Sequence, residues 1–128
     1  MDAGKLGFTP DTVIQELGWD DDVDDTLRAA IAERTGNDLV DGDYGDVVDG
    51  VILWWRDGDG DLTDGLVDAL TDIDGAGSVW LLTPKVGRPG YVAGADIGEA
   101  ADIAGLSVST TAAVAPEWVA TKLTTQRR

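Results

Sequence analysis

The apolar residues of this chain fall into short runs that are separated by turn-forming residues. Val51–Trp55 (VILWW) and Ser78–Pro84 (SVWLLTP) are continuous apolar runs, which are typical of strands covered on both faces of a sheet. Thr12–Leu17 (TVIQEL) follows a proline turn and predicts a shorter first strand. Leu106–Val114 and Glu117–Thr125 alternate more strongly and are separated by an Ala-Pro dipeptide, which predicts a terminal antiparallel pair.

A first helix is predicted in the N-terminal quarter of the chain. The apolar positions within residues 23–31 lie on one helical stripe. The run Asp20–Asp25 precedes this stripe, and carboxylates at a helix start cap free backbone amides and suit the positive end of the helix dipole. Gly36 provides a C-terminal stop. Residues 37–50 are rich in turn formers and predict only a brief edge strand or a helical turn.

Two further helices are predicted in the second half of the chain. Leucine and isoleucine recur at helical spacing over Leu62–Ile73, and we expect this helix to end near Asp74-Gly75. A shorter helix is expected from Asp96 to Ala104, because Asp96 and Glu99 have the spacing of a capping box.

The order of these elements predicts the fold class. Strands that alternate with helices indicate a mostly parallel sheet with helices on both faces. We therefore predict an α/β fold, a small Rossmann-like three-layer sandwich whose mostly parallel sheet ends in an antiparallel C-terminal strand pair. The length suits one core, so residues 1–128 are expected to form a single α/β domain with short flexible ends. The chain has no apolar run of membrane-spanning length, no signal-peptide pattern and no cysteine, which favours a cytoplasmic protein.

Charge is distributed unevenly along the chain. Residues 1–74 contain 21 acidic and 4 basic residues, whereas residues 75–128 contain 4 acidic and 5 basic residues. A net charge of −16 repels phosphate backbones, so direct DNA binding is not expected. A basic protein partner is more compatible with this charge, although the aspartates also suit a solvated face that keeps the protein soluble.

One aspartate-rich segment has almost the spacing of a calcium-binding loop. Asp57, Asp59, Asp61 and Asp68 occupy positions 1, 3, 5 and 12 of an EF-hand pattern. However, a predicted strand precedes the segment, position 6 is leucine where glycine is needed, and position 12 is the shorter carboxylate. We therefore interpret the segment as a strand-to-helix turn, with Asp61 or Thr63 as the N-cap, and expect no metal site.

The sequence contains no recognisable catalytic or cofactor-binding arrangement. The turn after the first predicted strand, Leu17–Asp25 (LGWDDDVDD), has one glycine and many negative charges, unlike a phosphate-binding cradle. The chain also lacks histidine, cysteine and a G-x-S-x-G elbow. The prediction is therefore a non-enzyme without a cofactor, and a methyl-donor site remains an alternative.

The residues with the best placement for a binding surface lie after two of the predicted strands. Trp19, in a turn beside acidic residues, is the best candidate for an exposed anchor. Lys85 and Arg88 follow a central strand at the edge where open α/β sheets build their sites, although they also fit a plain Pro/Gly loop with two solubilising bases. The candidate partner-binding residues are Trp19, Asp20, Asp21, Asp22, Asp24, Lys85 and Arg88.

Three segments of the chain are distinctive: LGFTPDTVIQELGWDDDVDD (Leu6–Asp25), DLVDGDYGDVVDGVILWWR (Asp38–Arg56) and WLLTPKVGRPG (Trp80–Gly90). Together they resemble a small actinobacterial family, long described as a domain of unknown function, over about residues 6–123. The resemblance implies a truncated methyltransferase-type Rossmann sheet and links the chain to actinomycete oxidative-stress regulators of transcription, which act with an alternative sigma factor. Those regulators sense oxidants through a cysteine pair, and this chain contains no cysteine.

Two functional hypotheses follow from these observations. The first is a non-enzymatic stress-response regulator of transcription that contacts a sigma factor or RNA polymerase, with its acidic N-terminal half facing a basic partner. The second is a small-ligand or S-adenosylmethionine-type binding domain, including a degenerate methyltransferase-like fold. The sequence leaves the oligomeric state open, a homodimer included.

Overall fold

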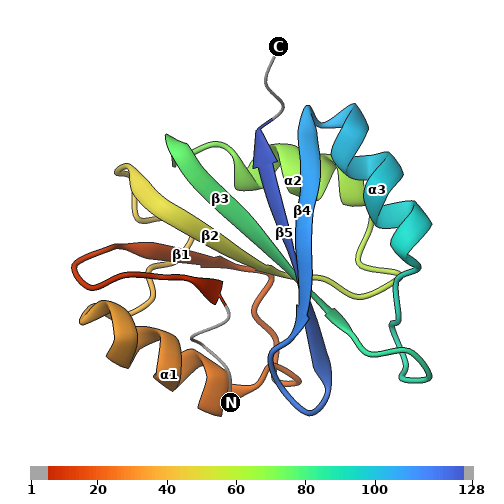
Figure 1. The fold of residues 1–128 in the computed structure, drawn as a ribbon, viewed down its shortest axis with the longest axis horizontal. Coiled ribbons are helices and arrows are strands. Elements are labelled where there is room, and N and C mark those ends of the chain that lie inside the picture. Colours follow the sequence, from red (N-terminus) through yellow and green to blue (C-terminus); the bar gives the residue numbers. More distant parts are fainter. Residues whose placement is uncertain (1–5, 126–128) are drawn as a thin grey trace.

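A mixed β-sheet forms the centre of the computed structural model, which describes residues 6–125 except for the side chains of residues 74–76. The ends predicted to be flexible lie largely outside this range. Within residues 6–125 the sheet has five strands in the order β1-β2-β3-β5-β4 (Figure 1). Their bounds are β1 (Ile14–Leu17), β2 (Val48–Trp54), β3 (Ile73–Pro84), β4 (Leu106–Ala113) and β5 (Trp118–Thr125).

Both parallel and antiparallel pairing occur in this sheet, as the sequence predicts. β1, β2 and β3 are parallel to one another. β5 lies antiparallel between β3 and β4, with Leu82 opposite Ala120 and Ala120 opposite Ala112. The predicted α/β class with an antiparallel C-terminal strand pair is therefore confirmed.

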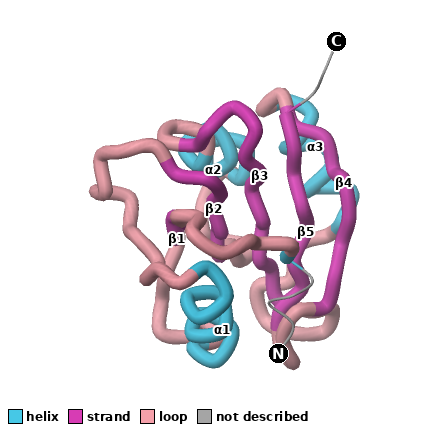
Figure 2. Tube along the Cα trace, turned by 60° about the vertical axis from the view of Figure 1, so that its left-hand side comes forward, coloured by secondary structure: helices cyan, strands magenta, loops and turns pink. Residues whose placement is uncertain are grey.

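Helices cover both faces of the sheet and create the three predicted layers. α1 (Asp25–Thr35) packs on one face, and α2 (Leu62–Ala69) and α3 (Gly94–Ile103) pack on the other, as the two views in Figures 1 and 2 show. No helix in the described part of the chain is long and apolar enough to cross a membrane.

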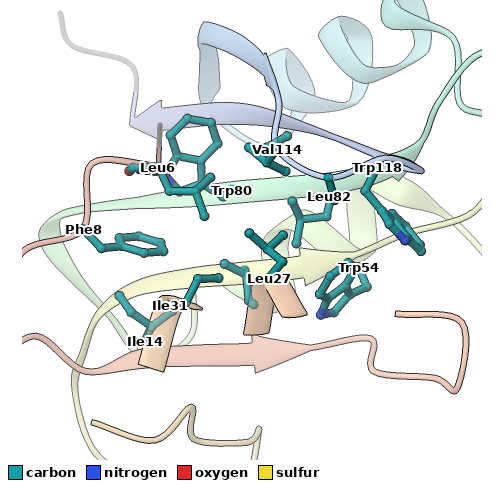
Figure 3. Packing of buried hydrophobic residues seen from close by; sticks show 13 residues of the cluster. Leu6, Phe8, Ile14, Leu27, Ile31, Trp54, Trp80, Leu82, Val114 and Trp118 are labelled. Atoms are coloured by element: carbon teal, nitrogen blue, oxygen red, sulfur yellow. Dashed lines mark hydrogen bonds between the residues drawn. The ribbon is translucent and has the colours of Figure 1, made fainter. Parts of the chain in front are cut away.

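The core beneath α1 is rich in aromatic side chains. Trp54 and Trp80 are fully buried beside Leu27 and Ile31 of α1 (Figure 3). Trp54 meets Trp118 edge to face, with ring centroids 4.8 Å apart, a geometry that adds to the stabilisation from area burial alone. Trp55, the next residue, points to the opposite face of the sheet. There it packs against the hydrophobic cluster beneath α2 and α3, as expected for adjacent residues of an extended chain.

The first helix follows its sequence signals closely. The Asp24 side chain accepts a hydrogen bond from the Leu27 amide, and Gly36 ends the helix in the left-handed conformation with φ 78°. Residues 37–47 contribute only an isolated parallel bridge from Val40 to Gln15, and β2 begins at Val48, within the segment predicted to be rich in turns. The acidic run therefore does begin a helix, but only its last residue, Asp25, is helical.

The second and third helices differ from their predicted bounds. α2 ends at Ala69, and Ile73 is the first residue of β3, where it pairs with Val48. Ile73 continues the apolar spacing of the helix, but pairing with β2 gives its backbone hydrogen-bond partners in the sheet. α3 begins at Gly94, its N-cap is Ala93, and no side chain caps it, so the predicted capping box is wrong.

The helices that follow β1 and β2 lie on opposite faces of the sheet. α1 packs on one face, whereas α2, which joins β2 to β3, packs on the other. Between α1 and β2 the chain first pairs with β1 at the parallel bridge from Val40 to Gln15. The chain therefore leaves the carboxyl ends of β1 and β2 toward opposite faces.

Candidate functional site

The carboxyl ends of β1 and β2 are where an open α/β sheet usually binds a ligand. A crevice forms where neighbouring strands send their connections to opposite faces, and this arrangement occurs between β1 and β2. In this protein, the Arg56 side chain occupies that position. Arg56 lies two residues beyond the end of β2, and its side chain is only 13% exposed.

Arg56 joins the loops that leave the two strands. Its Nε and Nη2 atoms donate to the two carboxylate oxygens of Asp22, at 3.0 and 2.5 Å, and Nη1 donates to the Gly18 carbonyl at 2.7 Å. Asp59, in the loop toward α2, accepts a longer contact of 3.4 Å from Nη1. The guanidinium carbon also lies 5.3 Å from the centroid of the Trp118 ring, within the range of a cation–π interaction.

Two glycines permit the close packing around Arg56. A Cβ atom on Gly18 would lie 2.2 Å from the Trp54 carbonyl oxygen, and Gly18 also has a φ of 74° that favours glycine. A Cβ atom on Gly90 would lie 2.9 Å from the Arg56 Cβ atom. The loop after β1 and the loop after β3 thus both make close contact with the chain at the end of β2.

Electrostatics reinforce the Arg56–Asp22 contact in the folded state. The hydrogen bond from Arg56 lowers the pKa of Asp22 below its ordinary value. Burial disfavours the charged form of Arg56, but hydrogen bonds to Asp22 and Asp59 outweigh this effect and raise the pKa of the guanidinium. Both groups of this ion pair are therefore charged near neutral pH.

A second polar network lies beside the first, at the end of β1. The buried Glu16 carboxylate accepts hydrogen bonds from Arg28 at 2.6 and 2.8 Å and from Trp54 Nε1 at 2.9 Å. The hydrogen bond to Glu16 raises the pKa of Arg28. A carboxylate that accepts three hydrogen bonds in this way holds α1 against the sheet.

The acidic loop predicted to bind a partner lies at this same edge of the sheet. Trp19 is 56% exposed, and Asp20 and Asp21 beside it are exposed. Asp22 and Asp24 have structural roles, because one binds Arg56 and the other caps α1. The loop therefore presents a tryptophan and two aspartates outward while its last residues anchor it.

Lys85 and Arg88 lie on the loop after β3, at the same edge of the sheet. Arg88 forms an ion pair with Glu117, which precedes β5, and the Lys85 amide donates to the Glu117 carbonyl. The Gly90 carbonyl accepts from the Asp57 amide, so this loop also contacts the turn after β2. The structure thus brings both sets of predicted residues to one edge of the sheet, joined through residues 56–57.

The segment with calcium-loop spacing is a strand-to-helix turn. Asp61 is the N-cap of α2 and accepts hydrogen bonds from the amides of Thr63 and Asp64, while Asp59 contacts Arg56. In the part of the chain that the structure describes, no group of acidic side chains comes together in an arrangement that could hold a metal ion. Two of the four spaced aspartates thus have partners within the protein.

Arg56 is the site residue that the sequence reasoning did not identify. It is one of only four basic residues among residues 1–74, and it directly follows the apolar run Val51–Trp55. A lone arginine at that position, in a strongly acidic segment, was the available signal. Its partners Gly18 and Asp22 are 38 and 34 residues away, so the pairing itself was not visible in the sequence.

Solved structures with a similar fold are S-adenosylmethionine-dependent methyltransferases. Magnesium protoporphyrin IX methyltransferase from Synechocystis with bound SAM is 12% identical, with a TM-score of 0.61 over 97% of this chain and 74% of that one. A TehB-like SAM-dependent methyltransferase from Corynebacterium glutamicum is 13% identical, with a TM-score of 0.57 over 97% of this chain and 85% of that one. At this identity the similarity shows the Rossmann-like fold alone.

Relatives by sequence are found in mycobacteria. Uncharacterized proteins of Mycobacterium bovis and Mycobacterium tuberculosis are 50% identical over 121 residues, which cover 94% of this chain and 76% of theirs. A family model described as "Protein of unknown function (DUF3052)" matches residues 3–127.

Proposed function

Since the chain belongs to the DUF3052 family of proteins of unknown function, we propose a function from its own site: it is a non-enzymatic regulatory protein that binds a basic protein surface. The partner is a component of the transcription machinery, either a sigma factor or RNA polymerase. The observation that carries this proposal is the exposed Trp19, followed by the exposed Asp20 and Asp21 on an anchored loop.

The loop has the properties of a protein-binding anchor. Trp19 is more than half exposed, although tryptophan is a residue that monomeric proteins usually bury. Tryptophan is also enriched among the residues that dominate binding energy at interfaces. The Arg56–Asp22 ion pair and the cap formed by Asp24 hold the loop in place, which reduces the entropy lost on binding.

Charge supports the choice of partner. Residues 1–74 carry a net charge of −17, and the Trp19 loop lies within this half. Such a surface is complementary to basic protein regions, and those regions of sigma factors that bind DNA are basic. The resemblance to oxidative-stress regulators of transcription points to the same class of partner.

A binding measurement with purified components tests this proposal. Sigma factors and core RNA polymerase from the source organism are immobilised, and binding of the full chain is followed from low to physiological salt. We expect saturable binding that weakens as salt increases, because exposed charges are screened. A variant with Trp19→Ala, Asp20→Asn and Asp21→Asn is expected to bind at least about tenfold more weakly.

A matched variant on another surface serves as the control. Ile103→Ala with Glu99→Gln removes an exposed apolar side chain and an exposed carboxylate from α3. This variant is expected to bind as the wild type does. If neither sigma factor nor polymerase binds the wild type, or if the Trp19 variant binds unchanged, the proposal is wrong.

Methyl-donor binding is the second candidate, favoured by the fold shared with SAM-dependent methyltransferases. The position of Arg56 argues against methyl-donor binding. Its contacts with Asp22 and Gly18 occupy the place between the carboxyl ends of β1 and β2 where such a fold would bind a ligand. Calorimetric titration with S-adenosylmethionine and S-adenosylhomocysteine separates the candidates. We expect no saturable heat with the wild type, and a saturable signal would favour the second candidate.

A further inference from the structure

A cavity of about 460 Å³ lies between the sheet and the N-terminal part of α3. Its walls come from the end of β3, the facing surfaces of β4 and β5, the loop after β3 and the first turn of α3. The volume is within the range of small-molecule sites. The apolar side chains that line it include Val86, Tyr91, Val92, Ile97, Val108 and Val119.

Buried threonine hydroxyls provide polar groups in this otherwise apolar cavity. Thr83 and Thr121 line it and are only 3% and 5% exposed. Neither hydroxyl forms a hydrogen bond with the described residues. Among those residues no fully inaccessible side-chain oxygen or nitrogen lacks a partner, so both hydroxyls must be reachable from the cavity. Thr111, directly opposite Thr121 in the strand register, lines the same wall.

The start of α3 gives one end of the cavity a positive potential. Gly94, the first residue of the helix, lines the cavity, and the N-cap residue Ala93 supplies no side-chain acceptor. Free amide groups and the helix dipole at such an end favour an anion. Asp96 lies in the first turn but is exposed and is not part of the lining.

Lys85 adds a cation to the same cavity. It lines the cavity, is half-buried, and forms no ion pair with the described residues, whereas Arg88 on the same loop is paired with Glu117. The cavity therefore combines an apolar wall, reachable hydroxyls, an uncapped helix start and one cation. This combination suits an anionic group attached to an apolar body.

We propose that this cavity binds a small monocarboxylate with an apolar body, such as a medium-chain fatty acid. The carboxylate is held by Lys85 and the start of α3, the threonine hydroxyls bind its oxygens, and the apolar part lies along Val92 and Ile97. A single negative charge matches one lysine and one helix end, while the strongly acidic residues 1–74 disfavour a multiply charged anion. This site lies on the α3 face of the sheet and does not depend on the Trp19 loop.

Calorimetric titration of the full chain with decanoate, and with decanol as the uncharged control, tests the proposal. We expect saturable decanoate binding with a Kd below about 1 mM, and weaker binding of decanol. Lys85→Met is expected to weaken decanoate binding by roughly tenfold, the effect of losing one charge-assisted hydrogen bond, without changing decanol binding. Thr121→Val keeps the shape of the side chain and is expected to weaken decanoate binding by a few-fold.

Two further variants keep the test decisive. Arg88→Met removes a neighbouring cation that does not line the cavity, and decanoate binding is expected to be unchanged. Val108→Glu places a carboxylate at the half-exposed rim and is expected to abolish decanoate binding while leaving thermal unfolding close to that of the wild type. The proposal is overturned if decanoate shows no saturable binding, if decanol binds equally well, or if Lys85→Met binds decanoate as the wild type does.

Discussion

Removing the Arg56 side chain tests most directly whether its contacts hold together the loops at the carboxyl ends of β1, β2 and β3. The Asp22 carboxylate is 51% exposed, so screening by solvent limits that ion pair to about 1 kcal/mol. The hydrogen bond from the charged Nη1 to the Gly18 carbonyl contributes about 1–1.5 kcal/mol. The cation–π contact with Trp118 adds about 0.5–1 kcal/mol. Together these contacts predict that Arg56→Ala lowers the free energy of unfolding by about 3 kcal/mol.

Chemical denaturation followed by tryptophan fluorescence measures this loss of stability. A change of about 3 kcal/mol corresponds to a decrease in melting temperature of roughly 10 °C for a domain of this size. Arg56→Lys keeps the charge but lacks the planar fork that binds both Asp22 oxygens, so it is expected to recover less than half of the loss.

Arg88→Ala is the matched control for Arg56→Ala. It removes an arginine of the same edge whose ion pair with Glu117 joins side chains that are 48% and 47% exposed. Its loss is expected to be below about 1 kcal/mol. If Arg56→Ala lowers the free energy of unfolding no more than Arg88→Ala does, then Arg56 does not hold the three loops together. The interpretation that its side chain fills the crevice between β1 and β2 would then be wrong.

Three further outcomes are expected. Gly18→Ala should destabilise the fold by more than about 2 kcal/mol in denaturation experiments, because its Cβ would lie 2.2 Å from the Trp54 carbonyl oxygen; an unchanged midpoint would contradict this close approach. Glu16→Ala should cost about 2–4 kcal/mol because it leaves the buried Trp54 Nε1 without an acceptor, and Glu16→Gln should cost less; equal losses for the two variants would exclude the hydrogen bond as the cause. Because Arg56 lowers the native pKa of Asp22, this carboxylate stabilises the fold above its unfolded pKa near 4, and the stabilisation disappears as pH falls through the lower native pKa. The difference in unfolding free energy between the wild type and Asp22→Asn should thus be about 0.5–1 kcal/mol at neutral pH and shrink in strong acid, and a difference that grows in acid would show the opposite linkage.

Local patterns in the sequence determined most of the secondary structure. The apolar runs predicted β2 and β3, and the acidic run with Gly36 predicted α1, because caps and strand burial depend on neighbouring residues. The alternation of strands and helices was sufficient for the fold class. The same local reasoning extended the second helix to Ile73, whose place in β3 depends on pairing with Val48, 25 residues earlier.

Only the tertiary structure decided what lies at the carboxyl ends of β1, β2 and β3. Arg56 contacts the Trp19 loop through Gly18 and Asp22, which are distant in sequence, and its guanidinium lies at the strand ends from which α1 and α2 depart to opposite faces of the sheet. The threonines of the α3 cavity likewise come from different strands, whose order in the sheet is not the order of the chain. Sequence patterns fix the elements because their signals are local, whereas the site arises from contacts between segments that only the folded chain brings together.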